Sequence, residues 1–192
     1  TNSQSGIMKE NSDLGGMTEE QSICVTCGYC CDGTLFLHAS LNPGERGSLP
    51  EKIEENSYTE GDKDYFRLPC KYFAGTCTIY DREKAYVCSS YRCQLLKELA
   101  DNKVTLHDAL EVVREAGEIR KELIEDFKNI SGINAGNFRQ LLSELGKLMK
   151  SMPANEPSVM DYEILRSRCN IIEALLIKHF RSAEDFEKMI MK

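Results

Sequence analysis

Eight of the nine cysteines in this 192-residue chain lie between Cys24 and Cys93, and this concentration constrains the fold more than any other feature. The same segment contains few large apolar side chains. A stretch of about 70 residues with so little to bury folds poorly without added staples. Cysteines supply two kinds of staple, disulfide bonds and bound metal. We therefore expect the cysteines to hold this region together.

The compartment decides between the two kinds of staple. The first residues are polar and lack the apolar core of a secretory signal, so nothing marks the chain for secretion. Cytosolic thiols stay reduced, which favours metal over disulfides and predicts a cytoplasmic protein. No run of about 18 apolar residues predicts a membrane span. The absence of a first Met leaves the natural start of the chain open.

The net charge of −7, from 24 Lys and Arg against 31 Asp and Glu, argues against nucleic acid as a partner. Nucleic-acid-binding domains usually present a basic face. We expect a metal ion as ligand and a protein as the possible further partner or substrate.

The spacing of the cysteines is typical of metal ligands. The candidate ligands are Cys24, Cys27, Cys30, Cys31, Cys70, Cys77, Cys88 and Cys93. Two residues between cysteines let one turn direct two thiolates at one ion. Eight thiolates would fill two closed zinc sites, whereas the first three also match the start of a ferredoxin-type run. Because zinc and iron both accept four thiolates, the spacing leaves the metal open.

The adjacent pair Cys30 and Cys31 complicates any division of the ligands. Neighbouring side chains usually diverge, so the pair serves two centres, or it provides one ligand and one free thiol. Eight cysteines divide into two fours in many ways, and the sequence alone selects none of them.

From Cys24 to about Leu96 the chain resembles the CxxCxxCC family of zinc- or iron-chelating proteins, also called YkgJ-type cysteine cluster proteins. The resemblance rests on the opening motif at 24–31, on Asp32-Gly33-Thr34-Leu35-Phe36, on the C-x-I-Y piece at 77–80 and on the cysteines at 88 and 93. It departs at 81–87, which lack the usual Arg-Pro, and at Ser89, which replaces an Arg.

What the resemblance implies is metal binding by all eight cysteines. A flagellin lysine N-methylase shares the motif, which implies methyl transfer to protein lysine as an alternative. We expect a metal-binding protein with zinc or an iron–sulfur cluster and a structural or interaction role. The alternative is an enzyme or accessory factor that uses an iron–sulfur cluster in redox or methyl-transfer chemistry. No catalytic residue is assigned.

The predicted fold is mainly α, with minor irregular β. We expect a flexible tail at 1–17, a metal-stapled module at 18–96 and an antiparallel helical bundle at 97–192. Helices are predicted after caps at Thr18, Thr105, Ser158 and Ser182, and over 134–150, with a break at 151–157. Short strands are predicted at 35–37 and 66–68, with a further β-prone piece at 77–80 and a polar loop over 42–64.

Several single residues have simpler interpretations than catalysis or ligation. His38 is expected at the surface or in the core rather than on a metal, and Cys169 on the buried face of a helix. Asp32 is expected to form a turn with Gly33. The tyrosines at 29, 72, 80 and 91 are candidates to shield the metal. Lys71, Arg82 and Arg92 either offset thiolate charge or are solvated.

Overall fold

More than half of the described residues are helical. The computed structural model describes residues 16–153 and 158–182. Its helices are α1 (Glu19–Cys27), α2 (Glu51–Glu55), α3 (Tyr86–Ser90), α4 (Gln94–Ala100), α5 (Leu106–Ser131), α6 (Phe138–Ser151) and α7 (Val159–Phe180). Its strands are β1 (His38–Ser40), β2 (Ser57–Glu60) and β3 (Lys63–Arg67). The mainly α class is confirmed. Nearly all of the predicted tail, and the predicted last helix around Phe186 and Ile190, lie outside the described residues.

The long helix α5 forms as its sequence predicts. The Thr105 hydroxyl accepts a hydrogen bond from the Asp108 backbone N–H at 3.1 Å, and the Asp108 carboxylate accepts one from the Thr105 N–H at 3.2 Å. This reciprocal capping satisfies N–H groups that the first turn leaves unpaired. The helix ends at Gly132, whose φ of +73° suits glycine. Most of its apolar face is buried, with Leu123 and Phe127 fully enclosed, whereas Ile119 and Ile130 at the margin of that face are exposed.

Helix α7 is also where the sequence places it, but its predicted cap is wrong. Ser158 has helical dihedral angles and makes no capping hydrogen bond through its side chain. Its hydroxyl lies 4.0 Å from the sulfur of Met152 instead. The apolar face that the sequence predicts for α7, including Leu165 and Cys169, is buried.

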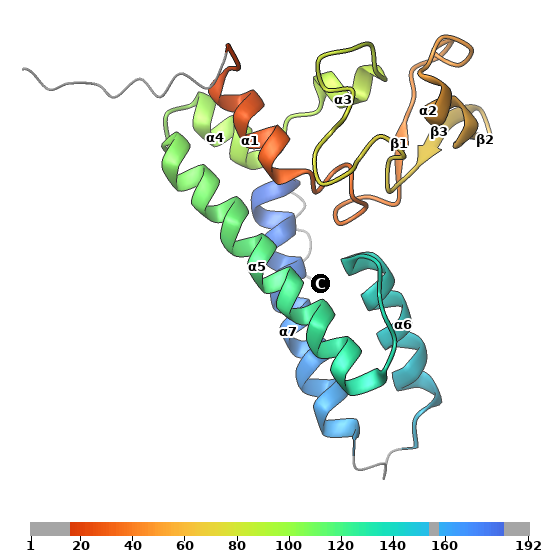
Figure 1. The fold of residues 1–192 in the computed structure, drawn as a ribbon, viewed down its shortest axis with the longest axis vertical. Coiled ribbons are helices and arrows are strands. Elements are labelled where there is room, and N and C mark those ends of the chain that lie inside the picture. The colour runs from red at the N-terminus through yellow and green to blue at the C-terminus, as the bar shows by residue number, and fades with distance from the viewer. Residues whose placement is uncertain (1–15, 154–157, 183–192) are drawn as a thin grey trace, which may run out of the picture.

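The bundle is antiparallel only around α7. The connection over 132–137 leads back alongside α5 (Figure 1). Helix α6 therefore runs in the same direction as α5, and α7 runs opposite to both. The contacts agree with this direction. Arg139, at the start of α6, and Arg120, midway along α5, both reach Thr34. The expectation of a fully antiparallel bundle is therefore wrong, because an extended connection rather than a tight turn joins α5 to α6.

Helices from the cysteine-rich half complete the bundle. The capping box predicted at Thr18 is present, and α1 buries Ile23 while packing against α5. Helix α4 packs against α7. It includes residues 96 and 97, so the division predicted between the module and the bundle falls inside a helix. We call the shared interior, which runs from Ile23 through the buried faces of α4 to α7, the helical core. No helix within 16–153 and 158–182 has the length and apolar character needed to cross a membrane.

A three-stranded antiparallel sheet lies away from the long helices, in the order β1-β3-β2 (Figure 1). The strand predicted at 66–68 corresponds to the end of β3, whereas the strand predicted at 35–37 begins later, at His38. The β-prone piece at 77–80 contributes only one bridge, between Phe73 and Cys77. A second interior, the sheet core, gathers Leu41, Ile53, Phe66, Ile79 and Ala85.

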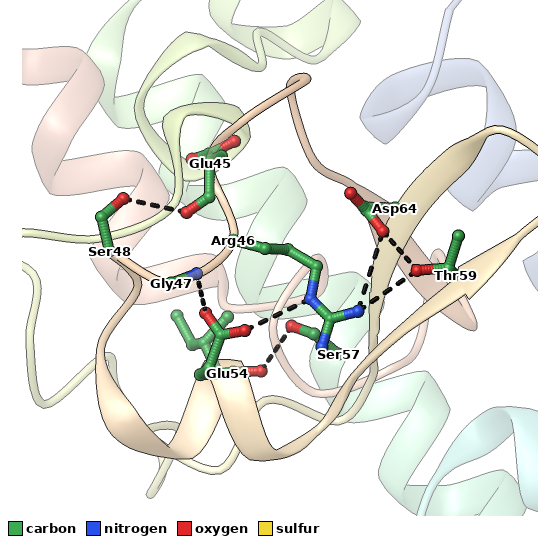
Figure 2. A network of polar contacts seen from close by, with 9 residues as sticks. Glu45, Arg46, Gly47, Ser48, Glu54, Ser57, Thr59 and Asp64 are labelled. Atoms are coloured by element: carbon green, nitrogen blue, oxygen red, sulfur yellow. Dashed lines mark hydrogen bonds and ion pairs between the residues drawn. The ribbon is translucent and has the colours of Figure 1, made fainter.

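The prediction of a polar, loop-rich segment over 42–64 holds for 42–50, which form no helix or strand, but it is wrong for 51–64, which form α2, β2 and the start of β3. Arg46 organises it: its guanidinium lies 3.2 Å from the Glu54 carboxylate and 3.8 Å from that of Asp64 (Figure 2). The same group donates to the Thr59 hydroxyl at 3.2 Å, and Glu54 accepts from the Gly47 N–H at 2.8 Å. Exposed ion pairs contribute little singly, but these join three parts of the segment, and Ile53, next to Glu54, is buried in the sheet core.

Two neighbouring residues of α7 provide a test of the bundle. Leu165 is 1% exposed and Ile164 is 52% exposed. Replacing Leu165 by Ala leaves a cavity among buried helices, and we expect a loss of about 2–5 kcal/mol in the free energy of unfolding. Ile164→Ala is the matched control and should change it by less than about 0.5 kcal/mol. Urea denaturation measures both, and equal losses would contradict this packing.

Candidate metal centre

The eight predicted ligands come from four separate parts of the chain. Cys24 and Cys27 lie on α1, and Cys30 and Cys31 lie in the turns that follow it. Cys70 and Cys77 flank a loop after β3, Cys88 lies on α3, and Cys93 is the residue that caps α4. All nine cysteines of the chain are unpaired thiols.

Six of these cysteines line one cavity of about 260 Å³, which we call the cysteine pocket. They are Cys24, Cys30, Cys31, Cys70, Cys77 and Cys88. The remaining two, Cys27 and Cys93, belong to the helical core. The fold therefore gathers residues that are up to 69 positions apart in sequence at the junction of its two interiors.

The donor set suits a soft metal, although no coordination sphere is preformed. Among the described residues, no group of three or more Cys, His, Asp or Glu side chains is arranged to hold a metal ion as it stands. Thiolates without other donors favour zinc and iron–sulfur clusters. Because a water molecule in the liquid takes up about 30 Å³, the cysteine pocket has space for more than one small ion. The residues fit such a group in kind and in number.

Burial raises the pKa of most of these thiols. It is the largest cause for seven of them: Cys24, Cys27, Cys30, Cys31, Cys70, Cys88 and Cys93. Nearby thiols raise most of these pKa values further, and Cys88 reaches about 12. Without metal these thiols are protonated at neutral pH, because a buried thiolate is poorly solvated. A metal that binds them must displace their protons.

Two lysines that the sequence did not suggest act on the eight cysteines, and one of them, Lys97, lowers the pKa of Cys93 against the larger effect of burial. Lys84 lines the cysteine pocket, and its charge lowers the pKa of Cys24 and of Cys88 against the larger effect of burial. Its ammonium group also donates to the Tyr80 carbonyl and lies 4.5 Å from the centre of the Tyr80 ring. Arg92, which the sequence offered as a counter-charge, instead pairs with Glu20 at 2.5 Å.

The loop after the fourth cysteine is fixed to the bundle by arginine. Asp32 is 14% exposed at its side chain and forms an ion pair with Arg120 of α5. Its other carboxylate oxygen accepts from the Thr34 N–H at 2.8 Å, so the predicted turn at Asp32 is present. Arg120 also donates to the Thr34 hydroxyl at 2.6 Å.

A second arginine completes this attachment. Arg139 of α6 donates to the carbonyl oxygen of Thr34 at 2.9 Å and pairs with Glu173 of α7 at 2.7 Å. We call Arg120 and Arg139 the arginine clamp. Sequence reasoning missed both, since each reads as an ordinary charged position on an amphipathic helix. Only the fold places them beside the loop.

The four tyrosines have different roles. Tyr29 points into the helical core, where its hydroxyl donates to the Val113 carbonyl at 2.7 Å. Tyr80 and Tyr91 line the cysteine pocket, as expected for residues that shield it. Tyr72 lies with the sheet core, and its hydroxyl accepts from the Lys52 N–H at 3.3 Å.

His38 and Cys169 are placed as the simpler interpretations suggest. His38 is exposed on β1 at the edge of the cysteine pocket, and its ring centre lies 4.9 Å from that of Tyr65. Cys169 is fully buried on α7, and burial raises its pKa to about 11. This thiol is therefore a packing residue, well removed from the other eight in sequence.

Gly28 ends α1 at the centre of the opening motif. Its φ of +64° is the left-handed conformation, and its N–H donates to the Cys24 carbonyl at 3.2 Å. A Cβ atom there would lie 2.5 Å from the ring of Phe73, which lines the cysteine pocket. This position needs glycine for both its backbone and its surroundings.

Comparison with protein-family models, curated proteins and solved structures gave no match. The relation to the CxxCxxCC family stays a prediction from the cysteine motifs.

Gly28→Ala tests the tight approach behind the ligand turn. Gly44 has a similarly positive φ of +79° but open space around it, so Gly44→Ala is the control for backbone strain alone. We expect Gly28→Ala to lose clearly more stability and more bound metal, because Phe73 must move within the pocket wall. Thermal unfolding and elemental analysis measure the two effects. Equal behaviour of the two variants would contradict the role given to Phe73.

Arg120→Met tests the arginine clamp. It leaves the Asp32 carboxylate mostly enclosed without its cation, and we expect a loss of about 1–3 kcal/mol in the free energy of unfolding. Arg114 lies on the same helix in exposed ion pairs with Glu118 and Glu111, so Arg114→Met should have little effect. Urea denaturation compares the two, and a similar loss in both would show that the clamp contributes nothing special.

Proposed function

We propose that this chain is a metal-binding protein whose eight clustered cysteines hold zinc or an iron–sulfur cluster, with a structural role in joining its two interiors. The observation that carries the proposal is the gathering of six of these cysteines around one pocket, with the other two beside it in the helical core. The convergence of cysteines from four parts of the chain on one place indicates a common function for them. Packing alone does not require sulfur at all of these positions.

The pocket supports thiolate ligation in chemical terms. Lys84 supplies positive charge beside it, and backbone N–H groups of Tyr29 and Tyr72 donate toward the sulfur atoms of Cys27 and Cys70. Such contacts favour the anionic form of sulfur that binds metal. The fixed loop at 32–34 limits the motion of the ligands that precede it.

A structural role follows from the position of the pocket. The cysteine pocket is lined by residues of both interiors. Ile53 and Phe66 come from the sheet core, and Phe36 and Tyr91 pack on the helical core. A metal bound there would tie the sheet lobe to the bundle. The free energy of metal binding would then contribute to the stability of the fold.

A second candidate is a redox or methyl-transfer role for an iron–sulfur cluster. The observation that favours it is the exposure of Cys24 and Cys88 at the pocket. Structural zinc sites are closed by four protein ligands, whereas catalytic sites keep an open position. A centre that includes exposed cysteines is accessible to a substrate or to a redox partner.

Elemental analysis and a visible absorption spectrum of the full chain, purified without air, test the proposal. We expect either about two zinc ions per chain and no colour, or iron with sulfide and a broad brown absorbance. Zinc favours the structural role, and iron with sulfide favours the second candidate. Cys169→Ser is the matched control, because its buried thiol lies outside the cluster, and it should keep the full metal content.

Protein that carries neither metal and whose clustered thiols are oxidised to disulfides would contradict the proposal. That result would instead identify the cysteines as a disulfide framework.

A further inference from the structure

We propose that the eight cysteines form two separate four-cysteine centres: Cys24, Cys27, Cys30 and Cys93 on the side of the bundle, and Cys31, Cys70, Cys77 and Cys88 on the side of the sheet. This inference rests on the proposed function, since it divides the same ligands. We call the two sets the bundle centre and the sheet centre. Four thiolates are a complete ligand set for one zinc ion or for one four-iron cluster.

The two interiors of the protein separate the cysteines in this way. Cys93 is buried in the helical core, and Cys27 and Cys30 pack against it. Cys70 and Cys77 pack against the sheet core. No described cysteine is shared by the two interiors. Five of the eight ligands are therefore assigned by packing alone.

The position of Cys24 on α1 assigns it to the bundle centre. Ile23, the residue before it, is 1% exposed and buried in the helical core, and α1 packs against α5 and α4. Cys27 lies three residues further along the same helix, and Cys30 lies in the turn that follows. Cys24 therefore joins the bundle centre.

The sheet centre follows from the backbone around the remaining thiols. The Cys70 N–H donates to the Cys31 carbonyl oxygen at 2.7 Å, which joins Cys31 to Cys70. Val87, the residue before Cys88 on α3, packs against the sheet core together with Cys70 and Cys77. Cys31 and Cys88 therefore join Cys70 and Cys77.

The adjacent pair Cys30 and Cys31 is the point of division. Side chains of neighbouring residues diverge, so two adjacent thiols suit two centres better than one. The turn is set by hydrogen bonds from the Cys31 N–H and the Asp32 N–H to the Gly28 carbonyl, both at 2.9 Å. This turn carries the chain from one interior to the other.

Paired variants of the full chain test the division by metal content. If the wild type holds two centres, Cys27→Ser with Cys93→Ser removes one of them, and so does Cys70→Ser with Cys88→Ser. Each double variant should keep about half of the metal. Cys27→Ser combined with Cys70→Ser damages both centres and should lose nearly all of it. Cys169→Ser is the control and should lose none.

Thiol labelling of the unaltered chain gives a second test that needs no folded variant. Reduced, metal-free protein receives about one equivalent of zinc and is then alkylated. Molecules with four protected cysteines in the cluster are fragmented intact in a mass spectrometer. We expect the opening motif to divide three to one: Cys24, Cys27 and Cys30 protected together with Cys93, or Cys31 alone protected together with Cys70, Cys77 and Cys88.

The outcomes separate the two proposals. A wild type without metal, with no thiol protected by added zinc, overturns the proposed function and this division with it. A wild type with metal in which all three double variants lose everything overturns the division alone, because it indicates one shared centre. Protected sets that divide the opening motif evenly, or that exchange Cys24 with Cys31, also overturn it.

Discussion

The ion pair between Asp32 and Arg120 fixes the one loop on which both interiors depend. This loop follows the opening cysteine motif and leads into β1, so its position decides where the sheet lies relative to the helices. Arg139 holds the same loop through the Thr34 carbonyl. A carboxylate removed from water requires its cation, so this attachment has a defined geometry that a surface ion pair would lack.

The sequence predicts the helices well because their signals are local. Thr105 and Asp108 specify the start of α5, and the apolar repeat through Leu123 and Phe127 specifies its buried face. The direction of α6 is a different matter. It depends on the path of 132–137 and on the reach of Arg139 to Thr34, more than 100 positions away along the chain. No local pattern encodes such a contact.

The segment at 42–64 shows why a polar composition misleads. Its charged residues indicate a solvated loop. Arg46 nevertheless pairs with Glu54 on α2 and with Asp64 on β3 (Figure 2). Ile53, the one buried residue of this segment, contributes its side chain to the sheet core. The cysteines are a mixed case: their spacing identifies them as one set of candidate ligands. The grouping that we propose for them depends on which interior each one contacts, and spacing does not encode those contacts.

Cys93 lies directly before α4, and this position has a mechanical consequence. The next residue, Gln94, donates through its N–H to the Arg181 carbonyl at 3.2 Å, at the end of α7. Tyr91, two residues earlier, donates to the Phe180 carbonyl at 3.0 Å. Residues on both sides of Cys93 are therefore hydrogen-bonded to the end of α7, so a displacement of Cys93 would also displace the end of that helix.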